Sequence, residues 1–140
     1  MSHSTTHIYT DGSCIGNPGP GGWAWVMVDD HNEVLDETGW YHSEDTTNNR
    51  MELEAVIDAL HHVPVDYKVY IHTDSLYVIN CAEHRWKRNK NVDLWDEFDK
   101  WDCGVTFIHV KGHDGDGFNE YVDKAANRWA NRGKMLRGLV

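Results

Sequence analysis

The spacing of the apolar residues changes near Asn48, and this change limits the folds open to the chain. Before it, residues 5–11, 22–29 and 33–42 are rich in aromatic and β-branched residues and are joined by short turn sequences. That pattern is typical of three antiparallel strands in a meander. After it, apolar residues recur at the spacing of one helix face, namely Leu53, Val56, Ile57 and Leu60. We therefore expect the chain to begin with sheet and to continue with helix.

Segments typical of strands and of helices alternate in the rest of the chain. Residues 67–74 and 105–110 have the composition of strands. Further helices are expected at three places: from Ser75, from Asn91 or Asp93 to about Trp101, and from Asn119 to Arg132. A meander followed by this alternation predicts an α/β fold, a mixed sheet of five strands flanked by helices. One domain over residues 1–140 accommodates it, with residues 1–5 and 133–140 expected to be flexible tails.

A glycine-rich stretch, "NPGPGG" at residues 17–22, follows the first expected strand. A glycine loop that holds phosphate normally opens a helix, whose first amide groups bind the anion. Here the next residues, "WAWVMV" at 23–28, are typical of a strand, and the P-loop lysine is missing. Residues 17–21 are therefore predicted to connect two strands, and the carboxylate at the end of the first strand, Asp11, needs another explanation.

The composition excludes several classes of protein. No run approaches the ~18 apolar residues of a membrane span, so we expect a soluble, cytoplasmic protein with no membrane partner. The three cysteines, Cys14, Cys81 and Cys103, lack metal-type spacing and are expected to be free thiols. The net charge of -10 opposes binding to a polyanion, but residues 67–140 hold twelve Lys and Arg against eleven Asp and Glu. The basic segment "RWKRNK" at 85–90 fits a solvated turn and a nucleic-acid contact equally well.

Four acidic residues stand at comparable places in the expected elements. Asp11 and Asp74 each end a strand, whereas Glu52 and Asp123 each lie in the first turn of a helix. If the two strands are neighbours, the four carboxylates can converge, and such a cluster repels itself unless it binds protons or cations. Carboxylate ligands suit Mg²⁺ or Mn²⁺, and two such ions can drive an in-line displacement at phosphorus. Helix dipoles also favour acids in first turns, so each acid alone fits a structural role too.

Four sequence stretches together resemble the motifs of one family. In order they are "YTDGSCIGNPGPGG", "TTNNRMEL", "HTDS" followed by "NVDLW", and "VKGHDGDGFNEYVD". They are similar to the motifs of the type 1 ribonuclease H family, which cleaves the RNA strand of RNA–DNA hybrids, and the resemblance extends from about residue 7 to 130. It implies the ribonuclease H-like fold, a five-stranded mixed sheet whose first three strands are antiparallel. It also implies that the four acids bind two Mg²⁺ ions, with Mn²⁺ as a substitute.

The resemblance also assigns roles in substrate handling. His113 matches a loop histidine credited with proton transfer or product departure, and the glycines around it suit a mobile loop. Contacts to the RNA minor groove fall on Cys14, Asn17, Asn48, Asn49 and Glu52. Contacts to the DNA strand fall on Thr47 and Asn91, which match a phosphate pocket, and on Trp86, which matches an aromatic wall. Trp95 and Trp129, at helical positions, are expected in the core.

Two departures from the family pattern affect substrate binding. Only sixteen residues separate Asp74 from Asn91, so the basic protrusion that many bacterial members carry there is mostly missing. We therefore expect weaker binding of hybrids than in members that have it. Asp45 stands where the family has the arginine of the phosphate pocket, and its charge would repel a phosphate.

Three functions are compatible with these sequence features. The favoured one is a monomeric endonuclease, a phosphodiester hydrolase that cuts the RNA strand of hybrids largely without regard to base sequence. The first alternative is a catalytically weak module that binds hybrids or double-stranded RNA, suggested by Asp45 and the missing protrusion. The second is an exonuclease with a similar carboxylate site, which the amide-rich "TTNNRMEL" disfavours. Cleavage of a hybrid separates the three.

Overall fold

The computed structural model describes residues 4–64, 66–101, 104–111 and 117–138. The elements are β1 (Thr5–Cys14), β2 (Gly19–Val28), β3 (Val34–Thr46), α1 (Asn48–Leu60), β4 (Lys68–Thr73), α2 (Leu76–Ala82), α3 (Val92–Asp99), β5 (Val105–His109) and α4 (Gly117–Arg137). The strands form one sheet in the order β3-β2-β1-β4-β5. The pairs β1–β2 and β2–β3 are antiparallel, and β1–β4 and β4–β5 are parallel. The predicted mixed sheet with three antiparallel strands is therefore confirmed.

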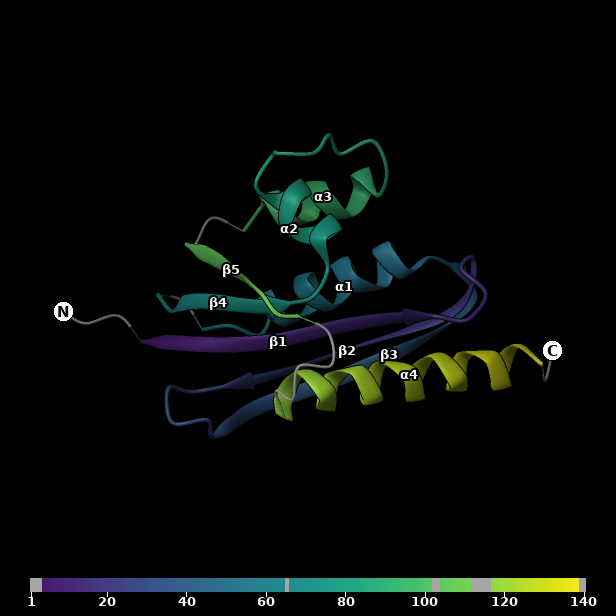
Figure 1. Cartoon of the computed structure of the whole chain (residues 1–140), viewed down its shortest axis with the longest axis horizontal. Coiled ribbons are helices and arrows are strands. Elements are labelled where there is room, and N and C mark those ends of the chain that lie inside the picture. The colour runs from purple at the N-terminus through teal and green to yellow at the C-terminus, as the bar shows by residue number, and fades with distance from the viewer. Residues whose placement is uncertain (1–3, 65, 102–103, 112–116, 139–140) are drawn as a thin grey trace.

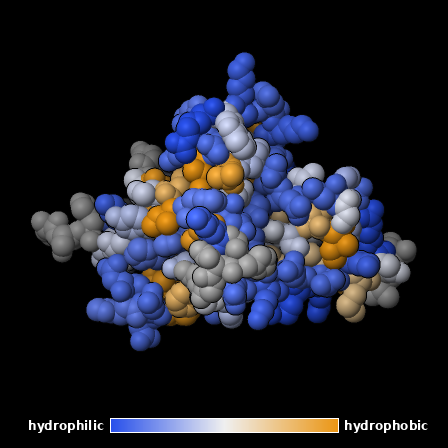
Figure 2. Space-filling model, viewed as in Figure 1, coloured by the Kyte–Doolittle hydropathy of each residue, from blue (hydrophilic) through white to orange (hydrophobic). Residues whose placement is uncertain are grey.

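The helices cover both faces of the sheet, with α1, α2 and α3 on one side and α4 on the other (Figure 1). Successive side chains of a strand point to opposite faces of the sheet, so each strand contributes to two cores. Ile8 and Trp25 pack with the residues of α1, whereas Tyr9 and Val26 pack with Val122 of α4. Within the described residues, no helix is both long enough and apolar enough to cross a membrane. Figure 2 shows a largely hydrophilic surface on the face that it presents.

The first hairpin is longer than the sequence indicated. The first strand runs on past Asp11 to Cys14, and the second begins at Gly19, so that Cys14 pairs with Gly21. The glycines lie inside the strand because neighbouring elements approach it closely. A Cβ atom on Gly22 would lie 2.3 Å from the backbone nitrogen of Ala130 in α4. Turn composition was therefore a misleading signal here, since these glycines serve packing against a helix.

The last helix is also longer than predicted. It continues to Arg137, so the expectation of a flexible tail from residue 133 is wrong for residues 133–137. Gly133 does not end the helix because it is buried, and a Cβ atom there would lie 2.5 Å from the carbonyl oxygen of His42 in β3. The glycine thus lets the helix lie close to the sheet.

Candidate metal centre

Four acidic side chains come together where β1, α1, β4 and α4 meet. Carboxylate oxygens of Asp11, Glu52 and Asp74 all lie within 4.8 Å of one another. Asp123, near the beginning of α4, hydrogen-bonds to the side chain of Asp11. Asp11 and Glu52 are 6% and 9% exposed. The structure therefore brings together the four acids that were singled out in the sequence.

Strand pairing explains why Asp11 and Asp74 are neighbours. The parallel pairing of β1 with β4 places Tyr9 opposite His72, and each acid follows two positions later. The carboxylate of Asp11 is held by its own backbone, because its Oδ1 accepts a 2.9 Å hydrogen bond from the amide of Gly12. Because the two strands are parallel neighbours, both carboxylates lie side by side near the end of β4.

The position of Glu52 depends on how α1 begins. Thr47 caps the helix, and its Oγ1 accepts a 3.2 Å hydrogen bond from the amide of Arg50. Glu52 follows one turn later and reaches Asp11 because β1 has a glycine at the contact. A Cβ atom on Gly12 would lie 2.4 Å from the backbone nitrogen of Glu52. The close approach of α1 to β1 therefore requires glycine at position 12.

Replacing Gly12 by alanine should test this contact. The added methyl group meets backbone atoms of α1, so the helix has to move away from β1, and we expect a loss of about 1–3 kcal/mol in the free energy of unfolding. Because Glu52 moves with the helix, hybrid cleavage should fall as well. Urea denaturation and cleavage rates measure the two effects. Gly104→Ala is the control, since nothing lies within 4 Å of a Cβ atom there, and equal stability of the two variants would contradict the prediction.

The cluster carries pKa values far from those of free carboxyl groups. Burial raises the pKa of Asp11 from 3.8 to about 7; the hydrogen bond with Glu52 opposes this shift, and the charge of Asp74 adds to it. Burial also raises the pKa of Glu52 well above its ordinary value, and the charge of Asp11 contributes. Glu52 Oε2 is buried without a hydrogen-bond partner among the described residues. Such a site gains from any cation that neutralises it, and its oxygen ligands fit a hard divalent ion.

The residues assigned to the RNA strand gather at the start of α1. Asn17, in the β1–β2 connection, accepts a 3.0 Å hydrogen bond through its Oδ1 from the amide of Asn48. Asn48 and Asn49 are exposed, whereas the thiol of Cys14 is directed at backbone carbonyls, 3.3 Å from that of Thr46. The structure thus presents exposed amides at the beginning of the helix that carries Glu52.

Arg50 connects Asn91 to the beginning of α1 through hydrogen bonds. The guanidinium of Arg50 donates to Asn91 Oδ1 at 3.3 Å and to both carboxylate oxygens of Asp93 at 3.1 and 2.7 Å. Asn91 in turn donates to the hydroxyl of Tyr77 at 3.0 Å. Sequence reasoning missed Arg50 and Tyr77 in this role. One signal was present for Arg50, which is the sole cation among residues 1–66.

The basic segment before Asn91 is engaged in its own local contacts. Arg88 pairs with Asp99 at 2.6 Å and lies over the ring of Trp95, which is buried as predicted. Arg85 pairs with Glu83 at 2.5 Å. Trp86 is 49% exposed in the connection between α2 and α3, and among the described residues no contact joins it to the four carboxylates. The structure therefore presents Trp86 to solvent without placing it at the cluster.

Asp45 has a cationic partner that the sequence did not reveal. Its Oδ1 lies 2.5 Å from Nη1 of Arg137, in the last turn of α4. The pair is exposed, so its contribution to stability is small, but it offsets the negative charge expected to repel a phosphate. Cys14 and Cys81 are free thiols, as predicted, whereas His113 and Cys103 lie outside the described residues.

Comparison with known proteins points to one family. The family model for RNase H matches residues 3–131. Ribonuclease H from Ehrlichia chaffeensis is 46% identical over 134 residues, which cover 85% of this chain and 90% of that protein. Ribonuclease H from Anaplasma marginale is 41% identical over an alignment of 160 positions, which covers 100% of this chain and 96% of that protein.

Solved structures agree with the sequence relatives. LC11-RNase H1 in complex with an RNA/DNA hybrid has a TM-score of 0.78 at 28% identity, with 91% of this chain and 97% of that chain covered. RNase H1 from the halophilic archaeon Halobacterium salinarum has a TM-score of 0.73 at 26% identity, with 91% and 98% covered. The similarity therefore extends over nearly the whole chain in both sequence and fold.

Proposed function

The chain belongs to the ribonuclease H family, and from this membership we propose that it cuts the RNA strand of RNA–DNA hybrids by means of two divalent ions. It is an endoribonuclease, a phosphodiester hydrolase. The observation that carries the proposal is the convergence of Asp11, Glu52, Asp74 and Asp123, of which Asp74 directly follows β4 and the other three lie in β1, α1 and α4. A buried cluster of acids has little structural value, because it repels itself without a cation.

The four carboxylates are the residues that would hold the ions. The fit rests on their all-oxygen donor set and on the unpartnered, buried Oε2 of Glu52. We assign Mg²⁺, with Mn²⁺ as a substitute, since both prefer carboxylate ligands. When bound, two such ions supply an activated water and stabilise the leaving oxygen of the phosphodiester. Asp11 is the central ligand because it interacts with Glu52, Asp74 and Asp123 at once.

The exposed amides at the start of α1 are assigned to recognition of ribose. A side-chain amide both donates and accepts hydrogen bonds, which matches a 2′-hydroxyl group. Asn17, Asn48 and Asn49 would read the RNA strand in this way, with Cys14 and Glu52 beside them. Such contacts carry no information on the base, so cleavage should be largely independent of sequence.

The remaining assignments concern the DNA strand and proton transfer. Thr47 and Asn91 would bind a DNA phosphate, a placement supported by the Arg50 bridge between the two segments. Trp86 would contact the DNA strand, and His113 would aid proton transfer or product departure. The ion pair of Asp45 with Arg137 removes much of the repulsion that suggested a binding module without catalysis.

Cleavage assays on matched duplexes test the proposed function. We expect cutting of the RNA strand of a hybrid in Mg²⁺ and in Mn²⁺, with 5′-phosphate and 3′-hydroxyl ends, and none in EDTA. An RNA duplex and a DNA duplex of the same sequence should stay intact. A gel shift of the hybrid without cleavage in either ion would instead support the binding module, and digestion from DNA ends would support an exonuclease.

The role of the amides predicts a selective loss of substrate affinity. In Asn17→Ala the amide of Asn48 loses its acceptor, and the RNA strand loses a contact. We expect kcat/KM for the hybrid to fall by about 3-fold to 10-fold, mostly through a rise in KM, because one hydrogen bond is worth about 1 kcal/mol. Asn131→Ala is the control, since among the described residues that side chain hydrogen-bonds only within its own helix, to the carbonyl oxygen of Asn127. An unchanged KM in Asn17→Ala would contradict the assignment.

A further inference from the structure

The C-terminal two-thirds of α4 is basic in an otherwise acidic protein. The net charge of the chain is -10, yet residues 124–137 contain no Asp or Glu and hold five of the thirteen cations. These are Lys124, Arg128, Arg132, Lys134 and Arg137. A polyanion approaching the molecule would therefore be drawn to this helix rather than to the acidic surface around it.

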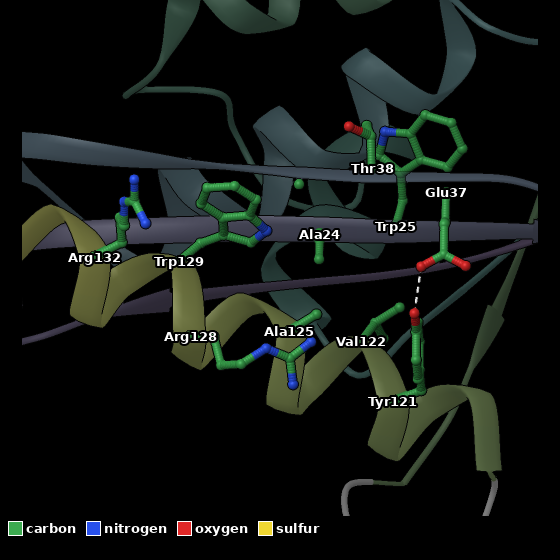
Figure 3. Close-up of a pocket in the computed structure, with 11 residues that line it drawn as sticks. Ala24, Trp25, Glu37, Thr38, Tyr121, Val122, Ala125, Arg128, Trp129 and Arg132 are labelled. Atoms are coloured by element: carbon green, nitrogen blue, oxygen red, sulfur yellow. Dashed lines mark hydrogen bonds between the residues drawn. The ribbon is translucent and has the colours of Figure 1, made fainter.

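A cavity of about 420 Å³ lies between α4 and the outer part of the sheet. Figure 3 shows Trp129 and Arg132 projecting from the helix toward the sheet and Arg128 lying along the helix beside Ala125, with Glu37 and Tyr121 facing each other at the opposite end. Ala24 and Gly39 line the cavity on the side of the sheet, and the indole of Trp129 packs directly against Gly39, where a Cβ atom would lie 2.3 Å from its Nε1. The cavity thus has a cationic end, an aromatic wall and an acidic end.

The charged side chains at the two ends of the cavity differ in whether they have hydrogen-bond partners. Among the described residues, no hydrogen bond or ion pair involves the side chain of Arg128 or Arg132. By contrast, the carboxylate of Glu37 accepts a hydrogen bond from the hydroxyl of Tyr121. An anionic group entering the cavity would therefore bind at the arginine end, where two guanidinium groups are available for phosphate.

Three aromatic rings extend the cavity onto the surface. The ring centroid of Trp40 lies 5.5 Å from that of Trp129 and 5.0 Å from that of Tyr41. Trp40 is 54% exposed although it is a large apolar side chain. The prediction that Trp129 lies in the core is wrong in this respect, because it is only half-buried and forms part of this cluster. Trp40 thus offers an exposed ring near cations, and such rings are the usual platform for unpaired bases.

This surface is separate from the four carboxylates. Asp123 and Arg132 are nine positions apart on α4, which at 3.6 residues per turn puts them on opposite sides of the helix. Arg128 is five positions from Asp123 and also lies on the far side. The cavity is therefore not an extension of the metal cluster.

We propose that the cavity and the Trp40, Tyr41 and Trp129 cluster form a second nucleic-acid site, which binds a single-stranded segment. Arg128 and Arg132 hold phosphate groups, and bases stack on the exposed rings. Single strands fit better than duplexes, because stacking on protein rings needs bases that are not already stacked and paired. The site does not depend on the hydrolytic function. A hybrid with a single-stranded overhang could occupy both sites at once.

Binding of a fluorescent oligo(dT) in EDTA tests the site. Without divalent ions the four carboxylates repel phosphate, so the binding measured comes from other surfaces. We expect Arg128→Gln/Arg132→Gln to weaken binding by at least about tenfold. It should also reduce the slope of log K against log salt by about 1.4, since each phosphate contact with a single strand contributes about 0.7. The control Lys124→Gln/Lys134→Gln removes the same charge from the same helix outside the cavity and should have a smaller effect on both quantities.

Aromatic variants provide a second readout. Trp40→Ser should weaken oligo(dT) binding and Trp40→Phe should largely retain it, because only the latter keeps a ring for stacking. Equal losses in the arginine and lysine variants, or no loss in either, would overturn the proposal, since general charge would then explain the binding. Capture of an acidic peptide at this surface without binding of oligo(dT) would also overturn it. Short blunt hybrids should still be cleaved by the arginine variant, which separates a failure of this site from a failure of the hydrolytic function.

Discussion

Asp11→Asn should abolish hybrid cleavage while leaving the fold intact. The asparagine keeps the shape of the side chain and an acceptor for the amide of Gly12, but it removes the central charge of the cluster. A bound metal ion contributes several kcal/mol to stabilising the transition state, and each 1.4 kcal/mol is a factor of ten in rate. We therefore expect a loss of at least about 10³-fold in the initial rate of hybrid cleavage in Mg²⁺.

A matched control is available in β3. Oδ1 of Asp36 also accepts a 2.9 Å hydrogen bond from the next backbone amide, but Asp36 is exposed and outside the cluster. Asp36→Asn should therefore cleave at the wild-type rate. Circular dichroism and thermal unfolding establish that both variants are folded. If Asp11→Asn cleaves as fast as Asp36→Asn, the metal cluster is not the catalytic centre.

Stability in the absence of metal should depend on pH in the direction set by Asp11 and Glu52. Their pKa values are raised in the folded state, so the folded protein binds protons more tightly than the unfolded chain does. The stabilisation is fully present below the unfolded pKa, near 4, and is lost as the pH rises to about 7. One pKa unit corresponds to about 1.4 kcal/mol. The shift of Asp11 from 3.8 to about 7 thus amounts to about 4 kcal/mol.

Comparison with Asp11→Asn isolates the part of this effect that depends on Asp11, which includes its influence on the pKa of Glu52. In EDTA, the free energy of unfolding of the wild type minus that of the variant should decrease between about pH 4 and about pH 7. Added Mg²⁺ should raise the stability of the wild type at neutral pH, because an ion that binds only the folded state stabilises it by mass action. The variant should respond less. Urea denaturation at several pH values measures both quantities, and a difference that is constant with pH would contradict the pKa shifts.

Some errors in the predicted elements share one cause. Gly21 was taken as part of a turn, and the last helix was expected to end before Gly133. At both positions the glycine instead allows a neighbouring segment to lie closer than a side chain would permit. Local composition cannot reveal such contacts, since the partner is distant in the sequence. The predicted helix after the meander was nearly right because its apolar face has a clear period over thirteen residues, Asn48–Leu60.

Part of the candidate site could be predicted from the sequence, and part of it could not. The sequence predicted Asp11 and Asp74 at strand ends and Glu52 and Asp123 in first turns, and family motifs selected these four among many acids. Only Asp74 is placed as predicted: β1 continues past Asp11 to Cys14, and Glu52 and Asp123 lie beyond the first turns of helices that begin at Asn48 and Gly117. It did not show the ion pair of Asp45 with Arg137 or the network of Arg50, Asn91 and Tyr77. Such pairs join residues up to 92 positions apart, and no periodicity or motif connects them.

Local periodicity and motifs of adjacent residues were enough to predict the order of the elements and a mixed five-stranded sheet, and to single out the four acids that converge. Only the tertiary structure decided how deeply Asp11 and Glu52 are buried, and therefore how strongly their pKa values are raised. It also decided that the basic part of α4 would face a cavity with exposed aromatic rings. The physical reason is that desolvation and charge interactions depend on distances in space, which the chain acquires only when α1 and α4 pack on opposite faces of the sheet.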